Sequence, residues 1–270
     1  MTANSTQQKI YFTLRLAVAM CFIGHGAFGI ITKPIWCNYF AVFGIGHDMA
    51  YRLMPLVGSF DLLMGITMLL YPVRAIPLWL VIWGIFTALL RPLSGEPLAE
   101  FIERAGNFGA PLMLLMLSGG VGKNGSNLFS PMRGNIYPDA KTISHVLTGL
   151  KLCAFFILAG HGWLNMIEKK GLVSQYAVLG FSHAAQTAFI IGICEINAAF
   201  LLLILPYRPV ILAFFIWKIS SELFYPHYEL FEWIERGGSY GVLLALWFAL
   251  DPQFSFKIKN NRIPEYTYSQ

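Results

Sequence analysis

Two histidines carry the clearest chemical signal in the sequence, because each stands between two glycines, in Gly24-His25-Gly26 and in Gly160-His161-Gly162. An imidazole changes its charge near neutral pH, so it can exchange a proton with a ligand or form a hydrogen bond to it. Glycine has no side chain, so another helix or a flat ligand can approach the ring closely. We therefore expect His25 and His161 to contact a ligand, and Gly24, Gly26, Gly160 and Gly162 to make room for it.

A second repeated motif is Glu103-Arg104, which returns as Glu235-Arg236. These pairs are expected to open the fourth and eighth helices, so that each half of the chain brings together one His, one Glu and one Arg. In that arrangement the glutamates set the imidazole tautomer or accept its proton, and the arginines hold the charge. The alternative is structural: a hydrogen-bonded histidine, with acids at a helix N-terminus where the dipole favours them.

The whole chain repeats these motifs in one order. His25 and His161 are 136 positions apart (161 − 25), and at that separation Lys33 matches Lys169, Gly44 matches Gly180 and His47 matches His183. Further along, with a small deletion in the second copy, three more matches follow: Trp83 with Trp217, Pro92 with Pro226, and Gly106 with Gly238. The sequence therefore predicts one structural unit present twice.

The composition is that of an integral membrane protein. The 270 residues are 56% hydrophobic and 12% charged, about half the charge of a soluble domain, and the mean hydropathy is +0.59. In a membrane protein the net charge of +5 is interpreted through the loops that carry it, because these indicate the orientation in the membrane. No nucleic-acid partner is expected. The four cysteines form no CxxC motif and are interpreted as buried small hydrophobic residues.

Eight apolar stretches separated by polar turns predict an all-α transmembrane fold, with eight helices in two pseudo-symmetric four-helix bundles related by a parallel internal repeat. The predicted helices cover residues 10–31, 49–71, 76–90, 104–118, 144–167, 186–205, 210–224 and 237–250. The predicted domains are a first repeat (1–118), a Gly/Pro-rich cytoplasmic linker (119–143), a second repeat (144–252) and a cytoplasmic tail (253–270).

Positive charges gather on one side of this plan. The termini, the two short turns and the linker hold Lys9, Arg74, Lys123, Arg133, Lys141, Arg208, Lys257, Lys259 and Arg262. Only Asp139, Asp251 and Glu265 oppose them on that side, whereas acids outnumber cations on the other. Because cytoplasmic loops carry the excess of Lys and Arg, both termini are expected to be cytoplasmic.

Several charges fall inside the predicted membrane helices. From their depths, Arg15 is expected to pair with Asp61, and Lys151 with Glu195, either as helix clamps or as a proton or ion relay. Lys218 and Glu222, one helical turn apart, are expected to neutralise each other.

Other kinds of site are weaker. Metal binding by His25, His47, His161 and His183 lacks the i, i+3 or i, i+4 spacing of ligands on one helix, and no metal is expected. Serine-nucleophile, phosphate-loop and Rossmann motifs are absent.

A four-helix unit with Gly-His-Gly near the end of its first helix, a lysine eight residues later and a Glu-Arg-x-Gly segment at the start of its fourth helix resembles the DoxX-like family of small bacterial membrane proteins. Typical members have one such unit, whereas this chain has two tandem copies. The residues that carry the resemblance are Gly24, His25, Gly26, Lys33, Glu103, Arg104 and Gly106, then Gly160, His161, Gly162, Lys169, Glu235, Arg236 and Gly238. The copies differ at Asn107-Phe108, which becomes Ser239-Tyr240, and in a shorter second loop that brings in His227, so the two sites are expected to be unequal.

The resemblance implies a bacterial inner-membrane protein that serves as the membrane subunit of a quinone-linked sulfur or thiol redox system. It has no intrinsic cofactor, its ligand is a quinone, and a periplasmic redox protein supplies electrons. Membrane lipid surrounds it, and its oligomeric state stays open. Two alternatives remain: a carrier for a small solute or lipid that uses the intramembrane charges, and a scaffold or assembly factor for another membrane protein. The sequence shows no Gly/Pro-interrupted helix at matching positions in both halves, which counts against the carrier.

Overall fold

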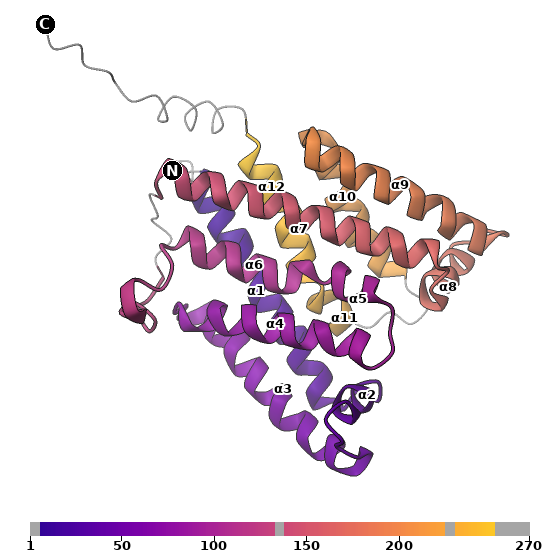
Figure 1. Ribbon diagram of the computed structural model, residues 1–270, viewed down its shortest axis with the longest axis horizontal. Helices are drawn as coiled ribbons and strands as arrows, with labels where there is room; N and C mark the ends of the chain where they lie inside the picture. Colours follow the sequence, from indigo (N-terminus) through magenta and orange to yellow (C-terminus); the bar gives the residue numbers. More distant parts are fainter. Residues whose placement is uncertain (1–5, 133–137, 225–229, 252–270) are drawn as a thin grey trace, which may run out of the picture.

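The computed structural model describes residues 6–132, 138–224 and 230–251, and this part of the chain is helical, with no β-strand (Figure 1). The first half forms α1 (Thr6–Ile30), α2 (Trp36–Ala41), α3 (His47–Leu70), α4 (Ala75–Leu93), α5 (Leu98–Glu103) and α6 (Ala105–Leu117). The second half forms α7 (Ala140–Met166), α8 (Lys170–Val178), α9 (Ala184–Ile204), α10 (Arg208–Ser221), α11 (Leu230–Glu235) and α12 (Gly237–Ala249). Short 3₁₀ helices occupy Lys123–Gly125 and Glu222–Phe224.

Five of these helices, α1, α3, α4, α7 and α9, are long and apolar enough to cross a membrane. A crossing needs about 20 helical residues. The chain is therefore an all-α protein with multiple candidate membrane spans, in agreement with the sequence prediction. Many large apolar side chains on α3 and α9 are exposed, including Leu56, Leu63, Phe200 and Ile204. Lipid contact accounts for such a surface.

The expected fourth and eighth helices, 104–118 and 237–250, correspond to α6 and α12, and each is preceded by a short helix, α5 or α11, that the sequence analysis did not predict. The break in each pair falls at Arg104 between α5 and α6, and at Arg236 between α11 and α12. At these points the backbone makes a tight turn, in which the Asn107 amide donates to the Arg104 carbonyl and the Ser239 amide donates to the Arg236 carbonyl. The Glu-Arg motifs stand at the starts of α6 and α12, as the sequence predicted, and each motif also ends the short helix that precedes it. Interrupted helices do occur at matching positions in both halves, which corrects the earlier objection to a carrier.

The two halves exchange these broken helices instead of forming separate four-helix bundles. α11 and α12 pack against α1, and α5 and α6 pack against α7. The approach is closest at glycine: a Cβ at Gly24 would collide with the backbone of Glu235, and a Cβ at Gly160 would collide with the backbone of Glu103. Each Gly-His-Gly motif therefore lies against the Glu-Arg motif of the other half.

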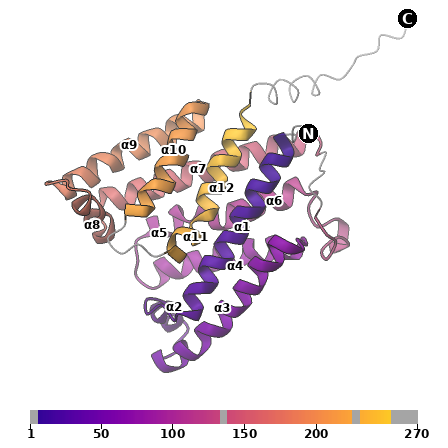
Figure 2. The ribbon, with the colours of Figure 1, turned by 180° about the vertical axis from the view of Figure 1, so that it is seen from behind.

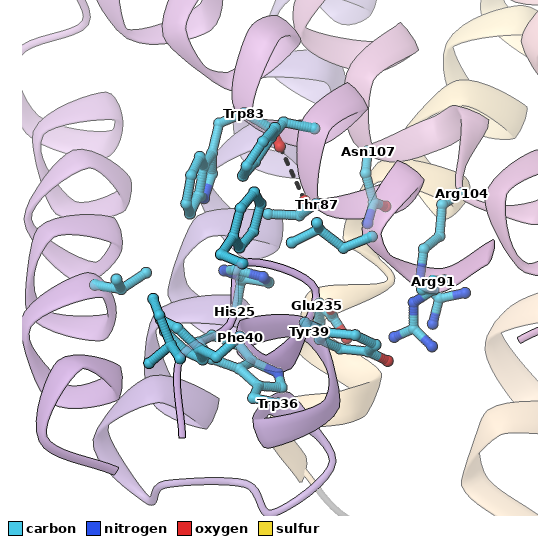
Figure 3. Close-up of a pocket in the computed structure, with 15 residues that line it drawn as sticks. His25, Trp36, Tyr39, Phe40, Trp83, Thr87, Arg91, Arg104, Asn107 and Glu235 are labelled. Atoms are coloured by element: carbon cyan, nitrogen blue, oxygen red, sulfur yellow. Dashed lines mark hydrogen bonds between the residues drawn. The ribbon is translucent and has the colours of Figure 1, made fainter. Parts of the chain in front are cut away.

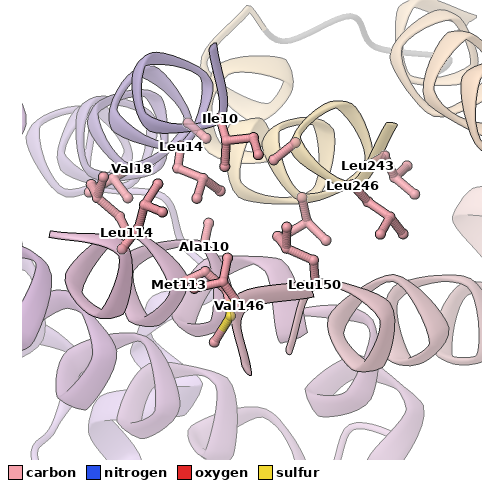
Figure 4. Packing of buried hydrophobic residues seen from close by; sticks show 14 of the residues in the cluster. Ile10, Leu14, Val18, Ala110, Met113, Leu114, Val146, Leu150, Leu243 and Leu246 are labelled. Atoms are coloured by element: carbon pink, nitrogen blue, oxygen red, sulfur yellow. The ribbon is translucent and has the colours of Figure 1, made fainter. Parts of the chain in front are cut away.

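The hydrophobic core confirms this exchange. It is built from α1, α6, α7 and α12, so that Leu14, Leu114, Leu150 and Leu246 belong to one buried cluster (Figure 4). α3 and α9 lie on opposite sides of this centre (Figures 1 and 2). The largest buried cluster is thus shared between the halves, while a smaller cluster around Trp36, Tyr39 and Met54 lies within the first half.

Outside the core, glycine contacts attach the two peripheral helices. A Cβ at Gly58 of α3 would lie 2.5 Å from the Gly26 carbonyl oxygen of α1, and a Cβ at Gly192 of α9 would lie 2.5 Å from the Gly162 carbonyl oxygen of α7. α1 and α7 therefore hold their partners in the same way.

The start of α1 and the end of α12 lie at the same end of the molecule, where the Lys9 ammonium stands 5.7 Å from the centre of the Phe248 ring. The predicted linker is shorter than expected because α7 already begins at Ala140. Before it, the Met132 amide donates to the Pro72 carbonyl, which fixes this segment to the first half. Four cations used in the charge argument, Arg133, Lys257, Lys259 and Arg262, lie outside the described residues, as do Pro226, His227 and the predicted tail from residue 253.

Candidate functional site

Each repeated histidine is held by a carboxylate from the neighbouring long helix. His25 Nδ1 lies 2.7 Å from Asp61 Oδ2, and the Trp83 indole N–H donates to the same oxygen at 3.3 Å. An ionised carboxylate only accepts hydrogen bonds, so Nδ1 carries a proton and Nε2 is the ring nitrogen that a ligand can reach. The same chemistry occurs in serine-protease triads, where an acid fixes the tautomer of a histidine.

The second half repeats the arrangement with different residues. His161 Nδ1 lies 2.8 Å from Glu195 Oε2, and the Trp217 indole N–H donates to Glu195 Oε1 at 3.2 Å. Here Asn165 adds a donor to Glu195 Oε2 at 3.0 Å. The position that matches Asn165 in the first half is Gly29 (165 − 136), so Asp61 lacks this donor. Accordingly, Asp61 Oδ1 is buried without a hydrogen-bond partner.

These contacts overturn two predicted ion pairs. Arg15 donates to the carbonyls of Met68 and Leu69, at 2.9 and 2.5 Å, and not to Asp61. These carbonyls belong to the last turn of α3, where helix carbonyls lack partners and a cation is favourable. Glu195 bonds to His161 and not to Lys151. Both acids were correctly predicted to be buried and paired, but the partner of each is a histidine.

The repeated lysines and glutamates tie the halves together. Lys169 Nζ lies 2.5 Å from Glu100 of the first half, and Lys33 Nζ lies 3.4 Å from Glu232 of the second. None of these four residues belongs to a Gly-His-Gly motif. Each ion pair joins a lysine of one half to a glutamate of the other half. The expected grouping of His, Glu and Arg within each half is therefore corrected in part: His25 shares its cavity with Arg104 of its own half, but the glutamate there is Glu235 of the other half.

A buried ionic network adjoins His161. Lys218 Nζ lies 3.1 Å from both Glu103 Oε1 and Glu222 Oε1, which confirms the predicted Lys218–Glu222 pair. Arg236 completes the network, 2.9 Å from Glu103 and 3.0 Å from Glu222. Two acids and two cations balance, as burial of charge requires. Both members of the first Glu-Arg motif meet this network, because Arg104 lies 3.7 Å from Glu103.

A cavity of about 140 Å³ opens beside His25 (Figure 3). Its walls are largely aromatic and its polar groups converge from α1, α4, α6 and α11. The residues that line it are His25, Trp36, Tyr39, Phe40, Phe43, Ile45, Val57, Trp83, Phe86, Thr87, Leu90, Arg91, Arg104, Asn107 and Glu235. A cavity of about this size accommodates one benzene-sized ring.

The rings beside His25 are ordered by stacking. Trp36 of α2 lies against His25, with the ring centres 4.6 Å apart. Trp83 stacks on Phe86, and Phe86 stacks on Phe43, with ring centres 5.6 and 5.8 Å apart. Phe43 and Phe86 are also exposed at the surface. The cavity therefore offers flat walls and an apolar edge on the outside of the protein.

Tyr39 and Arg91 close one side of the cavity. The Tyr39 hydroxyl donates to Glu96 at 2.6 Å, and the Arg91 guanidinium stands 5.5 Å from the centre of the Tyr39 ring. Burial raises the pKa of Tyr39 well above its ordinary value; Arg91 opposes this shift, and the bond to Glu96 adds to it. The hydroxyl therefore stays protonated at any physiological pH and remains a donor.

The two histidine sites are unequal. The side chain of His25 is 18% exposed, whereas that of His161 is 5% exposed. Position 172 matches Trp36 (172 − 136) and holds Leu172, a buried residue. His161 is thus enclosed by protein groups, and His25 borders the cavity.

No family model matches the chain, and neither a curated protein nor a solved structure matches it. Among the described residues, no group of three or more His, Cys, Asp or Glu side chains is placed to bind a metal ion. The described cysteines are free thiols, and Cys194 is exposed, which corrects its interpretation as a buried residue. The geometry around His25 is therefore the basis for a functional proposal.

Proposed function

We propose that this protein binds the ring of a quinone in the His25 cavity and serves as the membrane subunit of a quinone-linked sulfur or thiol redox system. The observation that carries the proposal is the position of His25. Asp61 holds one ring nitrogen, and the other edge of the ring borders a cavity that is aromatic and of one-ring size. Apolar pockets with a few convergent polar groups are the usual form of a small-molecule site.

A quinone suits this cavity in three respects. Its flat ring packs between indole and phenyl walls. The hydroxyl of its reduced form can donate to Nε2 of His25, and its carbonyl can accept from that nitrogen when the ring is protonated. Its apolar tail can leave the protein past Phe43 and Phe86, which are exposed on the surface.

The reaction needs both protons and electrons. A quinone takes up two electrons and two protons to give a quinol, and this chain contributes a proton-exchanging group in His25. Two thiols release the same two electrons and two protons when they form a disulfide. We infer that a periplasmic redox protein provides these electrons, and that the chain supplies the quinone site in the membrane.

The same proposal includes the finer architecture. We infer eight membrane-crossing segments in two DoxX-like copies, with α5 and α6 together as the fourth and α11 and α12 together as the eighth. The excess of cations at one end supports an inner-membrane protein with both termini in the cytoplasm. The contact of Lys9 with Phe248 supports a common side for the two ends.

A carrier for a small solute is the second candidate, and the interrupted helices favour it. Discontinuous helices at matching positions of two repeats line the central site of many transporters. Here the breaks at Arg104 and Arg236 adjoin the buried ionic network. Solute uptake by proteoliposomes that contain no quinone would support the carrier over the redox subunit.

The test is extraction of bound quinone from purified protein, with native mass spectrometry of the same preparation. We expect wild type to retain a quinone, His25→Ala to lose it, and His161→Ala to keep it although the variant is less stable. His161→Ala is a matched control because this histidine has the same carboxylate contact without bordering the cavity. Absence of quinone from wild type, or equal retention by His25→Ala, would refute the proposal.

A further inference from the structure

Glu103 and Glu235 occupy the same motif position in the two halves, but their surroundings differ. Glu103 is 3% exposed and lies within 3.1 Å of both Lys218 and Arg236. Glu235 lines the His25 cavity, and within the described residues no cation lies within 4 Å of it. One glutamate is neutralised by the protein, and the other faces a cavity.

The sequence explains this difference. Trp83 and Trp217 make the same contact, so their neighbours Gly84 and Lys218 correspond, and one turn later Ala88 corresponds to Glu222. The second half therefore carries its own hydrogen-bond donor, the Lys218 ammonium, buried against Glu103. In the first half a glycine replaces that lysine, and Glu235 has no such donor.

The cations that line the cavity are already engaged. Arg91 lies 3.0 Å from Glu96 and 3.4 Å from Glu100. Arg104 lies 2.7 Å from Glu100 and also donates to the Glu100 carbonyl. Both guanidinium groups thus have closer acid partners than Glu235, with which Arg104 interacts only at longer range, and Glu235 is left as a hydrogen-bond acceptor that lines the cavity.

His25 is a second acceptor at the same cavity. Because Nδ1 donates to Asp61, the neutral ring presents the lone pair of Nε2. A carboxylate can only accept hydrogen bonds, and His25 accepts through Nε2 whenever its ring is neutral, so both groups favour a ligand that donates. A quinol has two hydroxyl donors across its ring, whereas a quinone has only carbonyl acceptors.

We propose that Glu235 and His25 form an acceptor pair that makes the cavity selective for the reduced, dihydroxy form of the quinone. This inference rests on the proposed function and names the form of the ligand that the site holds. A quinol hydroxyl that donates to a carboxylate forms a charge-assisted hydrogen bond. A quinone would leave Glu235 without a partner in a partly buried site, at a cost that corresponds to a loss in affinity of about tenfold to 100-fold.

The preference has a redox consequence. The balanced couple is quinone + 2 electrons + 2 protons ⇌ quinol, and tighter binding of the quinol makes the bound quinone easier to reduce. For a two-electron couple, each tenfold preference raises the midpoint potential by about 30 mV. The cavity would thereby help a bound quinone accept the electrons of a thiol-bearing partner.

The experiment is an anaerobic titration of the full chain in lipid nanodiscs with a short-tailed 1,4-benzoquinone and with its quinol. Binding is followed by the quenching of tryptophan fluorescence, since Trp36 and Trp83 line the cavity. We expect wild type to bind the quinol at least about tenfold more tightly than the quinone, and Glu235→Gln to reduce this preference to within about threefold, because an amide can donate to a carbonyl. Glu232→Gln is the control, since Glu232 is on the same short helix, outside the cavity, and should leave the preference unchanged.

The outcomes separate the two proposals. Equal affinity of wild type for both forms, or a preference that survives in Glu235→Gln, overturns the selectivity while quinone binding stands. Binding of neither form overturns both. The wild-type comparison decides the question even where Glu235→Gln does not fold.

Discussion

A histidine bound to a buried acid occurs twice in this protein, but the two acids are satisfied to different degrees. Glu195 accepts from His161, Asn165 and Trp217. Asp61 accepts from His25 and Trp83 through one oxygen, while its other oxygen is buried without a partner. A buried unsatisfied oxygen has a cost that a structural role does not explain. Both oxygens of Glu195 thus accept bonds, although Oδ1 of the neighbouring Asn165 is buried without a partner, and only the histidine whose carboxylate partner is incompletely bonded borders the cavity.

Asp61→Asn should separate positioning from binding. The amide can donate to Nδ1 as well as accept from it, so the ring loses its fixed tautomer, and we expect quinone affinity to fall about tenfold. Retained quinone is measured after extraction, alongside the pH dependence of binding, which a purely structural bond would not change. Glu195→Gln is the matched control, with affinity preserved and thermal stability reduced. If the protein is a carrier, Asp61→Asn should instead abolish solute uptake in proteoliposomes. In that case neither Asp61→Asn nor Glu195→Gln should change the amount of quinone that the protein retains.

At the scale of helices, much of the structure follows from the sequence. Apolar stretches fixed the long helices to within a few residues, as for α3, predicted at 49–71 and observed at His47–Leu70. The short helices α5 and α11, which precede the turns at Arg104 and Arg236, were missed because six residues are too few to show a helical periodicity. The partner of Asp61 was missed because the pairing with Arg15 was predicted from membrane depth alone. Depth places a residue along the helix axis, but it does not show toward which neighbouring helix the side chain points. The repeat itself carried a usable signal. Asp61 and Glu195 are 134 positions apart (195 − 61), as are Trp83 and Trp217 (217 − 83), so the two acids occupy equivalent positions in the two halves.

The closest helix contacts predict the effect of a single methyl group. Gly24→Ala places a Cβ in the backbone of Glu235, where α1 meets α11. Overpacking against a backbone cannot be relieved by a rotamer change, so we expect a loss of about 3 kcal/mol, the upper part of the usual range. Thermal unfolding of the purified protein, monitored by size-exclusion chromatography, measures it.

Gly46→Ala is the control for that change, because a Cβ at Gly46 meets no atom within 4 Å and its φ of −69° suits any residue. It should leave the unfolding temperature nearly unchanged. Equal stability of Gly24→Ala and Gly46→Ala would show that α11 does not pack on α1 as described.

At the scale of the molecule, the exchange of broken helices makes the halves dependent on each other. The core unites Leu14, Leu114, Leu150 and Leu246 from both halves. Charge is shared in the same way, since Glu103 of the first half is neutralised by Lys218 and Arg236 of the second. The sequence repeat predicted two like units, but it could not predict the exchange, because a motif and its copy fit either partner equally well.

Separate expression of the halves tests this interdependence. Fragments 1–132 and 138–270 keep the contact of Met132 with Pro72 inside the first piece. Alone, the first fragment leaves Glu103 without Lys218 and Arg236, and breaking a buried pair in this way costs about 3–5 kcal/mol. We expect each fragment alone to aggregate after extraction, and the two co-expressed fragments to purify together in equal amounts with the helical content of the intact chain. A single fragment that elutes as a folded, monodisperse species would show that each half closes on itself, with its Glu-Arg motif against its own histidine.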